Sequence, residues 1–154
     1  MCGPNFRCIF EEGQELPSVT EFILCFLHLR KMYPDKLWSV FKFDFKAAFK
    51  RILIHPDDSA NLGFCLKNPE GVTEFWKWRV CPFGWRLSSY YWARVSGVVW
   101  RILKKLLVHV CPAYAGMIYV DDGLIICPRE LSGFVAAFML LFLSVLGAPL
   151  SWDK

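Results

Sequence analysis

Two adjacent carboxylates between apolar runs are the feature that most restricts how this chain can fold. Residues 118–127 read IYVDDGLIIC, so Asp121 and Asp122 interrupt an otherwise continuous strand-forming stretch. An unpaired ionised carboxylate is costly to bury, so these acids must lie at an exposed turn or be compensated by a cation. Because Asp and Gly favour hairpin turns, we predict strands over residues 114–120 and 124–127 around an Asp-Asp-Gly turn.

A third carboxylate is expected at the end of another strand. Residues 38–45 (WSVFKFDF) alternate, which predicts a half-buried strand with Phe41, Phe43 and Phe45 on one face and Asp44 on the polar face. If the two strand regions are neighbours, three like charges meet at one edge, and a divalent cation relieves their repulsion. Hard oxygen ligands select Mg²⁺ or Mn²⁺, and two such ions about 4 Å apart suit phosphoryl displacement. A plain hairpin turn without a metal remains the alternative.

Local patterns predict the other elements of the fold. Ser18-Val-Thr-Glu21 is a capping box that opens a helix ending near Tyr33, before Pro34. Residues 61–66 and 72–80 predict a second hairpin around an Asn-Pro-Glu-Gly turn, and residues 87–108 and 134–146 predict helices. This order indicates one α+β domain with an antiparallel sheet backed by helices.

The positive charge of the chain is concentrated in one segment. Residues 75–120 contain seven basic residues and no acidic one, although the whole chain has a formal net charge of only +4. Arg94, Arg101 and Lys105 are spaced to share one face of the expected helix over residues 87–108. Such a face attracts a nucleic-acid backbone, and an ordinary solvated helix face is the alternative.

Cysteine usage and the N-terminal sequence favour an intracellular protein, cytoplasmic or nuclear and not secreted. The seven cysteines are scattered with no metal-ligand spacing, and residues 1–13 have no apolar signal core. Residues 131–152 carry no charge, but the continuous apolar part, residues 134–146, is shorter than the roughly 20 residues that span a bilayer. A helix buried against the sheet is expected there, and a small membrane-anchored protein is the alternative.

Four motifs resemble those of reverse transcriptases of the retroelement, retrotransposon type. YVDD (residues 119–122) resembles the YxDD signature, FKFDFKAAFKRILIHPDD (41–58) the first palm motif, CPFGWRLSS (81–89) the "LPFGLxxSP" loop, and LGAPLSWDK (146–154) the following motif. They occur in the family's order and cover residues 41–154. The resemblance implies a polymerase palm over residues 41–154, partial fingers with an N-terminal helical segment over residues 1–40, and no thumb or RNase H domain.

The resemblance also assigns roles to individual residues. Asp44 and Asp121 would bridge two Mg²⁺ or Mn²⁺ ions and the incoming triphosphate, with Asp122 a less direct ligand and Lys154 the general acid for pyrophosphate. Phe49 matches the aromatic that excludes a 2′-hydroxyl, and it is a core residue on the plainer interpretation. The residues expected to shape the pocket over the nascent base pair are Phe83, Gly84, Trp85 and Arg86.

The implied function is RNA-directed DNA polymerisation. The primer 3′-hydroxyl would attack a deoxynucleoside triphosphate, with an RNA or DNA primer–template as partner and no membrane. The chain also departs from the pattern, since Ala47 replaces a polar residue and Ser89 replaces the usual Pro. The alternative is a truncated or decayed, non-catalytic remnant that at most binds nucleic acid.

Overall fold

The computed structural model describes residues 16–151, which form two compact units. One unit contains residues 47–93, and the other contains residues 16–46 together with 94–151. The second unit therefore gathers segments from both ends of the described chain, and the first is inserted between them. The domain boundary at residue 40 stays a prediction from resemblance.

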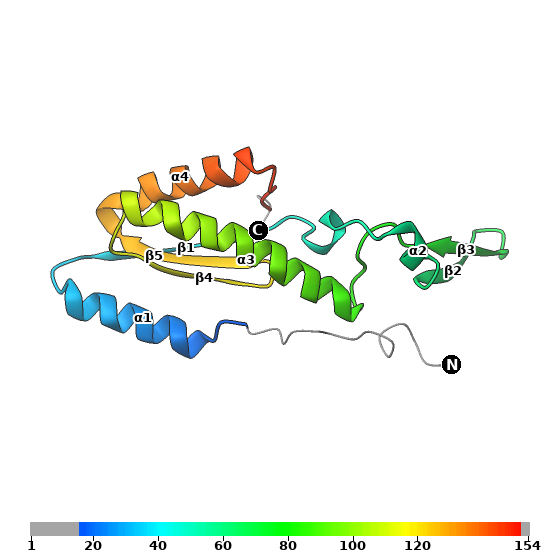
Figure 1. The fold of residues 1–154 in the computed structure, drawn as a ribbon, viewed down its shortest axis with the longest axis horizontal. Coiled ribbons are helices and arrows are strands. Elements are labelled where there is room, and N and C mark those ends of the chain that lie inside the picture. Colours follow the sequence, from blue (N-terminus) through cyan, green and yellow to red (C-terminus); the bar gives the residue numbers. More distant parts are fainter. Residues whose placement is uncertain (1–15, 152–154) are drawn as a thin grey trace. The chain divides into compact units, whose positions relative to one another are not determined.

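The unit formed by residues 16–46 and 94–151 is built on a three-stranded antiparallel sheet. The strand order is β1 (Trp38–Asp44), β5 (Asp122–Pro128) and β4 (Ala115–Tyr119). Helix α1 (Val19–Met32) covers one face, and α4 (Ser132–Val145) and the later part of α3 (Arg86–Val110) cover the other (Figure 1). The expected α+β class with an antiparallel sheet backed by helices is thereby confirmed.

The core of this unit lies between the sheet and helices α3 and α4. Leu103 and Leu107 of α3 are fully buried one helical turn apart, and Val135, Met139 and Leu143 of α4 repeat at the same four-residue spacing. The opposite face of α4 is exposed at Phe134, Leu141 and Val145. The uncharged stretch therefore forms a half-buried surface helix. Within residues 16–151, no helix is both long and apolar enough to cross a membrane.

The first helix begins as its sequence predicts. Ser18 Oγ accepts a hydrogen bond from the Glu21 backbone N–H at 3.1 Å, and the Glu21 carboxylate accepts one from the Ser18 N–H at 2.7 Å. These bonds favour the charged carboxylate and lower the pKa of Glu21. Tyr33 ends the helix just before Pro34.

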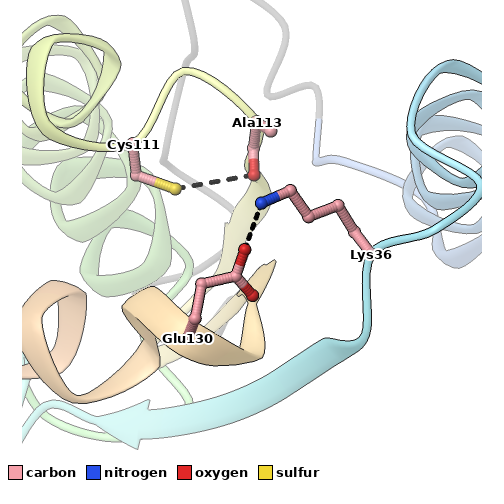
Figure 2. Close-up of polar contacts among 4 residues, drawn as sticks. All are labelled: Lys36, Cys111, Ala113 and Glu130. Carbon is pink, nitrogen blue, oxygen red and sulfur yellow. Dashed lines mark hydrogen bonds and ion pairs between the residues drawn. The ribbon is translucent and has the colours of Figure 1, made fainter.

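Contacts outside the ladder hold the beginning of β1 against the end of β5. The Arg129 N–H donates to the Leu37 carbonyl at 2.7 Å, and the Lys36 ammonium binds the carboxylate of Glu130, a residue of η3 (Arg129–Leu131) (Figure 2). The Lys36 hydrogen bond lowers the pKa of Glu130. These contacts help to fix the register in which β1 pairs with β5.

Two buried thiols lie near the Lys36–Glu130 ion pair and pack as small apolar groups. Cys111 Sγ lies 3.5 Å from the Ala113 carbonyl (Figure 2), and both Cys111 and Cys127 are fully buried. Burial raises the pKa of the Cys127 thiol to about 11, so the thiol is neutral at physiological pH. A neutral buried thiol behaves as a hydrophobic side chain, which suits this position in the core.

The unit formed by residues 47–93 contains the second hairpin. β2 (Gly63–Lys67) pairs antiparallel with β3 (Thr73–Lys77), and Asn68 Oδ1 accepts from the Glu70 and Val72 N–H groups in the expected turn. The short helices η2 (Phe49–Arg51) and α2 (Pro56–Ser59) precede the hairpin. An isolated antiparallel bridge pairs Leu53, which precedes α2, with Val80, which follows β3.

A glycine in the central strand makes room for an aromatic ring. Gly123 of β5 lies between Phe43 of β1 and Ile118 of β4 in the same cross-strand row. A Cβ atom at Gly123 would overlap three atoms of the Phe43 ring. Glycine is therefore required at position 123 by close packing.

Replacing Gly123 by alanine is expected to lower the free energy of unfolding by about 1–3 kcal/mol, because the buried Phe43 ring must move. Urea unfolding followed by circular dichroism measures the change. Gly133→Ala in α4 is the matched control, since a Cβ there meets nothing within 4 Å and alanine favours the helix, so this variant should be as stable as the wild type or up to about 1 kcal/mol more stable. Adding Phe43→Leu to Gly123→Ala should recover part of the loss, and equal losses in the two alanine variants would contradict this packing.

Candidate active site

Three carboxylates lie at one end of the three-stranded sheet. Asp44, the last residue of β1, is directly opposite Asp122, the first residue of β5. Asp121 precedes Asp122, and its carbonyl accepts a hydrogen bond from the Phe45 N–H at 3.0 Å. The Asp44 carbonyl accepts another from the Ser151 N–H at 2.8 Å, which holds the end of β1. The strands carrying these acids are therefore neighbours, as the sequence prediction required.

The turn beside these acids is not the Asp-Asp-Gly turn predicted from the sequence. Tyr119 pairs with Asp122, so the two-residue connection is Val120–Asp121, and Asp122 and Gly123 belong to β5. The packing of Phe43 over Gly123 explains the difference, because it places this glycine inside the sheet. As a result Asp122 shares a sheet face with Asp44.

Val120 holds a backbone conformation that its side chain disfavours. Its φ is 57°, in the left-handed region, where a β-branched residue is a rare outlier. Two-residue hairpin turns of the primed types need a positive φ at their first central position, and this is the position that Val120 occupies. The strain is maintained by the paired strands on either side, as is common at functional sites.

The site carries more negative than positive charge. Asp44 is only 9% exposed, and like charges directly opposite one another on a sheet are destabilising. Lys42 precedes Asp44 by two positions on the same strand face, and its Nζ lies 2.8 Å from Asp122 Oδ1. This pair is about half exposed, so its contribution to stability is at most about 1 kcal/mol. Lys42 therefore compensates the carboxylates only partly.

The donor set of the site suits a hard divalent cation. The three carboxylates supply oxygen ligands, and this end of the sheet contains no cysteine or histidine. Among residues 16–151, however, no three potential ligand side chains are already gathered around one point. Ion binding would therefore require the carboxylates to turn toward the ion. Asp122 would give up its ion pair with Lys42 and bind the ion instead.

The residues expected to form a nucleotide pocket lie in the unit formed by residues 47–93. The rings of Phe49 and Phe83 contact each other edge to face, with centroids 5.2 Å apart. Gly84 has a φ of 82°, so the loop needs glycine there. Ser88 Oγ donates to the Pro82 carbonyl at 2.7 Å and holds the loop on the first turn of α3, where Arg86 is exposed and Trp85 precedes it half-buried. The structure thus brings Phe49 and Phe83 together.

The three basic residues predicted on one helix face are all exposed on α3. Arg94, Arg101 and Lys105 lie opposite the stripe that includes the buried residues Leu103 and Leu107. Lys154 lies outside the described residues.

Sequence reasoning missed two residues of the site. Lys42 is one of them, and its two-residue spacing from Asp44 is the signal that could have placed it near the carboxylates. Val120 was placed at the end of a strand, and no local sequence pattern marks a valine as a turn residue. Its role emerges only from the register of three strands.

Similarity to known proteins extends over most of the chain. A family model described as reverse transcriptase (RNA-dependent DNA polymerase) matches residues 10–154. The genome polyproteins of two isolates of Petunia vein clearing virus, Shepherd and Hohn, are each 29% identical over 116 residues. The matched region is 75% of this chain and 4% of each polyprotein, so the chain spans a small fraction of these relatives.

Val120→Gly is expected to leave the chain as stable as before or slightly more stable, because glycine removes a strain of about 1–2 kcal/mol at a positive φ. Chemical unfolding checks this against Val40→Gly, a valine in β1 outside the positive-φ positions. Val40→Gly should be destabilising by about 1 kcal/mol. Equal destabilisation by the two variants would show that Val120 is not strained.

Proposed function

The chain belongs to the reverse transcriptase family, and from this premise we propose that it carries the nucleotidyl-transfer site of an RNA-directed DNA polymerase. The reaction is attack of a primer 3′-hydroxyl on the α-phosphate of a deoxynucleoside triphosphate, which forms a phosphodiester bond and releases pyrophosphate. The primer is paired to an RNA or DNA template. The truncated or decayed remnant that only binds nucleic acid is the competing proposal.

The observation that carries the proposal is the pairing of Asp44 with Asp122 beside Asp121. Segments far apart in the sequence bring these carboxylates to one strand end, where Phe45 donates to the Asp121 carbonyl at 3.0 Å. A plain hairpin turn does not need a third acid, 9% exposed, on the neighbouring strand. The concentration of carboxylates supports a role in holding cations.

Reverse transcriptases generally use divalent metal ions, and the carboxylates of this chain fit such ions. We assign Asp44 and Asp121 as the main ligands of two Mg²⁺ or Mn²⁺ ions, with Asp122 less direct. When bound, the ions supply charge stabilisation for the attacking and leaving oxygens. The strained Val120 turn and the Phe45 hydrogen bond orient the backbone that carries Asp121.

Two further groups of residues complete the assignment. The contact between the rings of Phe49 and Phe83 supports an apolar surface, on which Phe49 would exclude a ribonucleotide 2′-hydroxyl. Gly84, Trp85 and Arg86 continue this loop and would contact the base pair and its phosphates. Arg94, Arg101 and Lys105 form an exposed basic face suited to a primer–template backbone, and Lys154 is the proposed proton donor to pyrophosphate.

An intracellular location, cytoplasmic or nuclear, is part of the proposal. The five cysteines among the described residues are all free thiols, and a reducing compartment keeps thiols in this state. A retrotransposon origin is likewise proposed from the motifs alone.

Primer extension on an RNA template should show deoxynucleotide incorporation that requires Mg²⁺ or Mn²⁺. Asp121→Asn is expected to reduce the rate about 100-fold or more, because it removes a charged group that stabilises the transferring phosphate. Asp35→Asn, an exposed carboxylate in the loop before β1, is the matched control and should extend at the wild-type rate. Ribonucleotides should be incorporated much more slowly than deoxynucleotides.

Two results would contradict the proposal. Extension that survives Asp121→Asn would remove this carboxylate from the chemistry. A folded sample that extends no primer with either ion would favour the non-catalytic remnant.

A further inference from the structure

The β2–β3 hairpin carries a basic, aromatic face to which neither the family motifs nor the proposed chemistry assigns a role. Phe75 and Lys77 of β3 project from one face of the hairpin, and Cys65 and Gly63 are their cross-strand partners on β2. Phe75 is 85% exposed, which is exceptional for a phenylalanine in a strand. Lys67 extends the same face toward the turn and is also exposed.

The opposite face of the hairpin has a different composition. The rings of Phe64 and Trp78 contact each other there, with centroids 5.2 Å apart and a tilt of 36°, and Trp76 lies across from Phe64. Glu74, the acidic residue of β3, belongs to this second face, where it accepts a hydrogen bond from the Asn68 amide at 3.4 Å. The strand positions of the first face therefore present cations without an acidic residue.

A cleft continues the basic face toward α2. It has a volume of about 820 Å³ and lies within the unit formed by residues 47–93; Figure 1 shows α2 next to the hairpin. Its apolar side includes Leu53, which is 79% exposed, and its cationic side is formed by Lys77 and Arg79. The full lining is Leu53, Ile54, His55, Pro56, Ser59, Lys77 and Arg79.

The backbone keeps the two sides of the cleft together. The Ile54 N–H donates to the Arg79 carbonyl at 3.0 Å, and Leu53 bridges to Val80. The Ser59 hydroxyl donates a hydrogen bond to the Pro56 carbonyl at 2.7 Å. Asp57 Oδ2 lies 3.5 Å from His55 Nδ1. The cations of the cleft available to an anion are therefore Lys77 and Arg79.

We propose that this surface, defined as Lys67, Phe75 and the cleft residues Leu53, Lys77 and Arg79, binds single-stranded nucleic acid. Lysine and arginine on one face complement a chain of phosphates, and an exposed aromatic ring beside them offers a stacking platform for a base. A simple anion would use the cations without Phe75, and paired bases in a duplex are not free to stack. The surface thus selects an unpaired strand by charge and by exposed apolar area together.

The inference rests on the proposed function in one respect, since it assumes that the chain acts on nucleic acid. It adds a binding surface in the unit formed by residues 47–93, separate in sequence from the carboxylates. Binding without divalent ions or nucleotides therefore tests the surface independently of catalysis.

The test is fluorescence anisotropy of a labelled 15-nucleotide oligothymidylate with the full chain in EDTA, at several salt concentrations. Lys77→Gln/Arg79→Gln should weaken binding about tenfold or more and make the slope of log affinity against log salt about 1.4 shallower. Phe75→Ala should weaken binding about fivefold or more with little change in the slope. Because the substituted residues are exposed, each variant should fold as the wild type does, and circular dichroism checks this.

Arg30→Gln/Lys31→Gln is the charge-matched control, because both residues are exposed in the last turn of α1. It should bind the strand as the wild type does. Equal binding by the wild type and Lys77→Gln/Arg79→Gln, or an equal loss in the α1 control, would overturn the inference. Hairpin-dependent binding without primer extension would leave the inference standing while the proposed catalysis fails.

Discussion

The antiparallel register of β1 against β5 is the constraint on which the candidate site depends. It places Asp44 opposite Asp122 at one end and Trp38 opposite Pro128 at the other. A slip by one residue would turn every side chain of a strand to the other face of the sheet. The Arg129–Leu37 hydrogen bond at the far end and the Phe45–Asp121 bond at the site both oppose such a slip. Contacts far from the carboxylates therefore help to position them.

The position of the turn beside the carboxylates results from side-chain packing, and it leaves one backbone residue strained. The Phe43 ring over Gly123 excludes any larger residue from position 123, so the turn is displaced to Val120 and Asp121. Val120 consequently holds a positive φ, and Asp122 joins the strand face that carries Asp44 and Lys42. The sheet thus stabilises a concentration of carboxylates at one strand end, where the half-exposed ammonium group of Lys42 pairs with Asp122. The divalent cation that we propose would complement that arrangement.

Local chemistry made much of the fold predictable from the sequence. The capping box at Ser18 and the alternation of WSVFKFDF predicted α1 and β1 because each signal lies within a few residues. The prediction of an Asp-Asp-Gly turn was wrong, because the turn is at Val120–Asp121. Its position depends on Phe43 packing across strands rather than on turn propensity. The Lys42–Asp122 contact likewise requires the three-dimensional pairing. The motifs predicted the family correctly, while the roles of individual residues stay predictions.

The central claim is that Asp44 and Asp121, with Asp122 less directly, form a divalent-ion site. Titration of the chain with Mn²⁺, followed by electron paramagnetic resonance of the free ion, measures this binding without nucleotides or nucleic acid. The account predicts that the wild type binds Mn²⁺ and that Asp44→Asn weakens this binding about tenfold or more, because the variant removes a charged oxygen ligand. Equal affinity of the two proteins for Mn²⁺ would contradict the account.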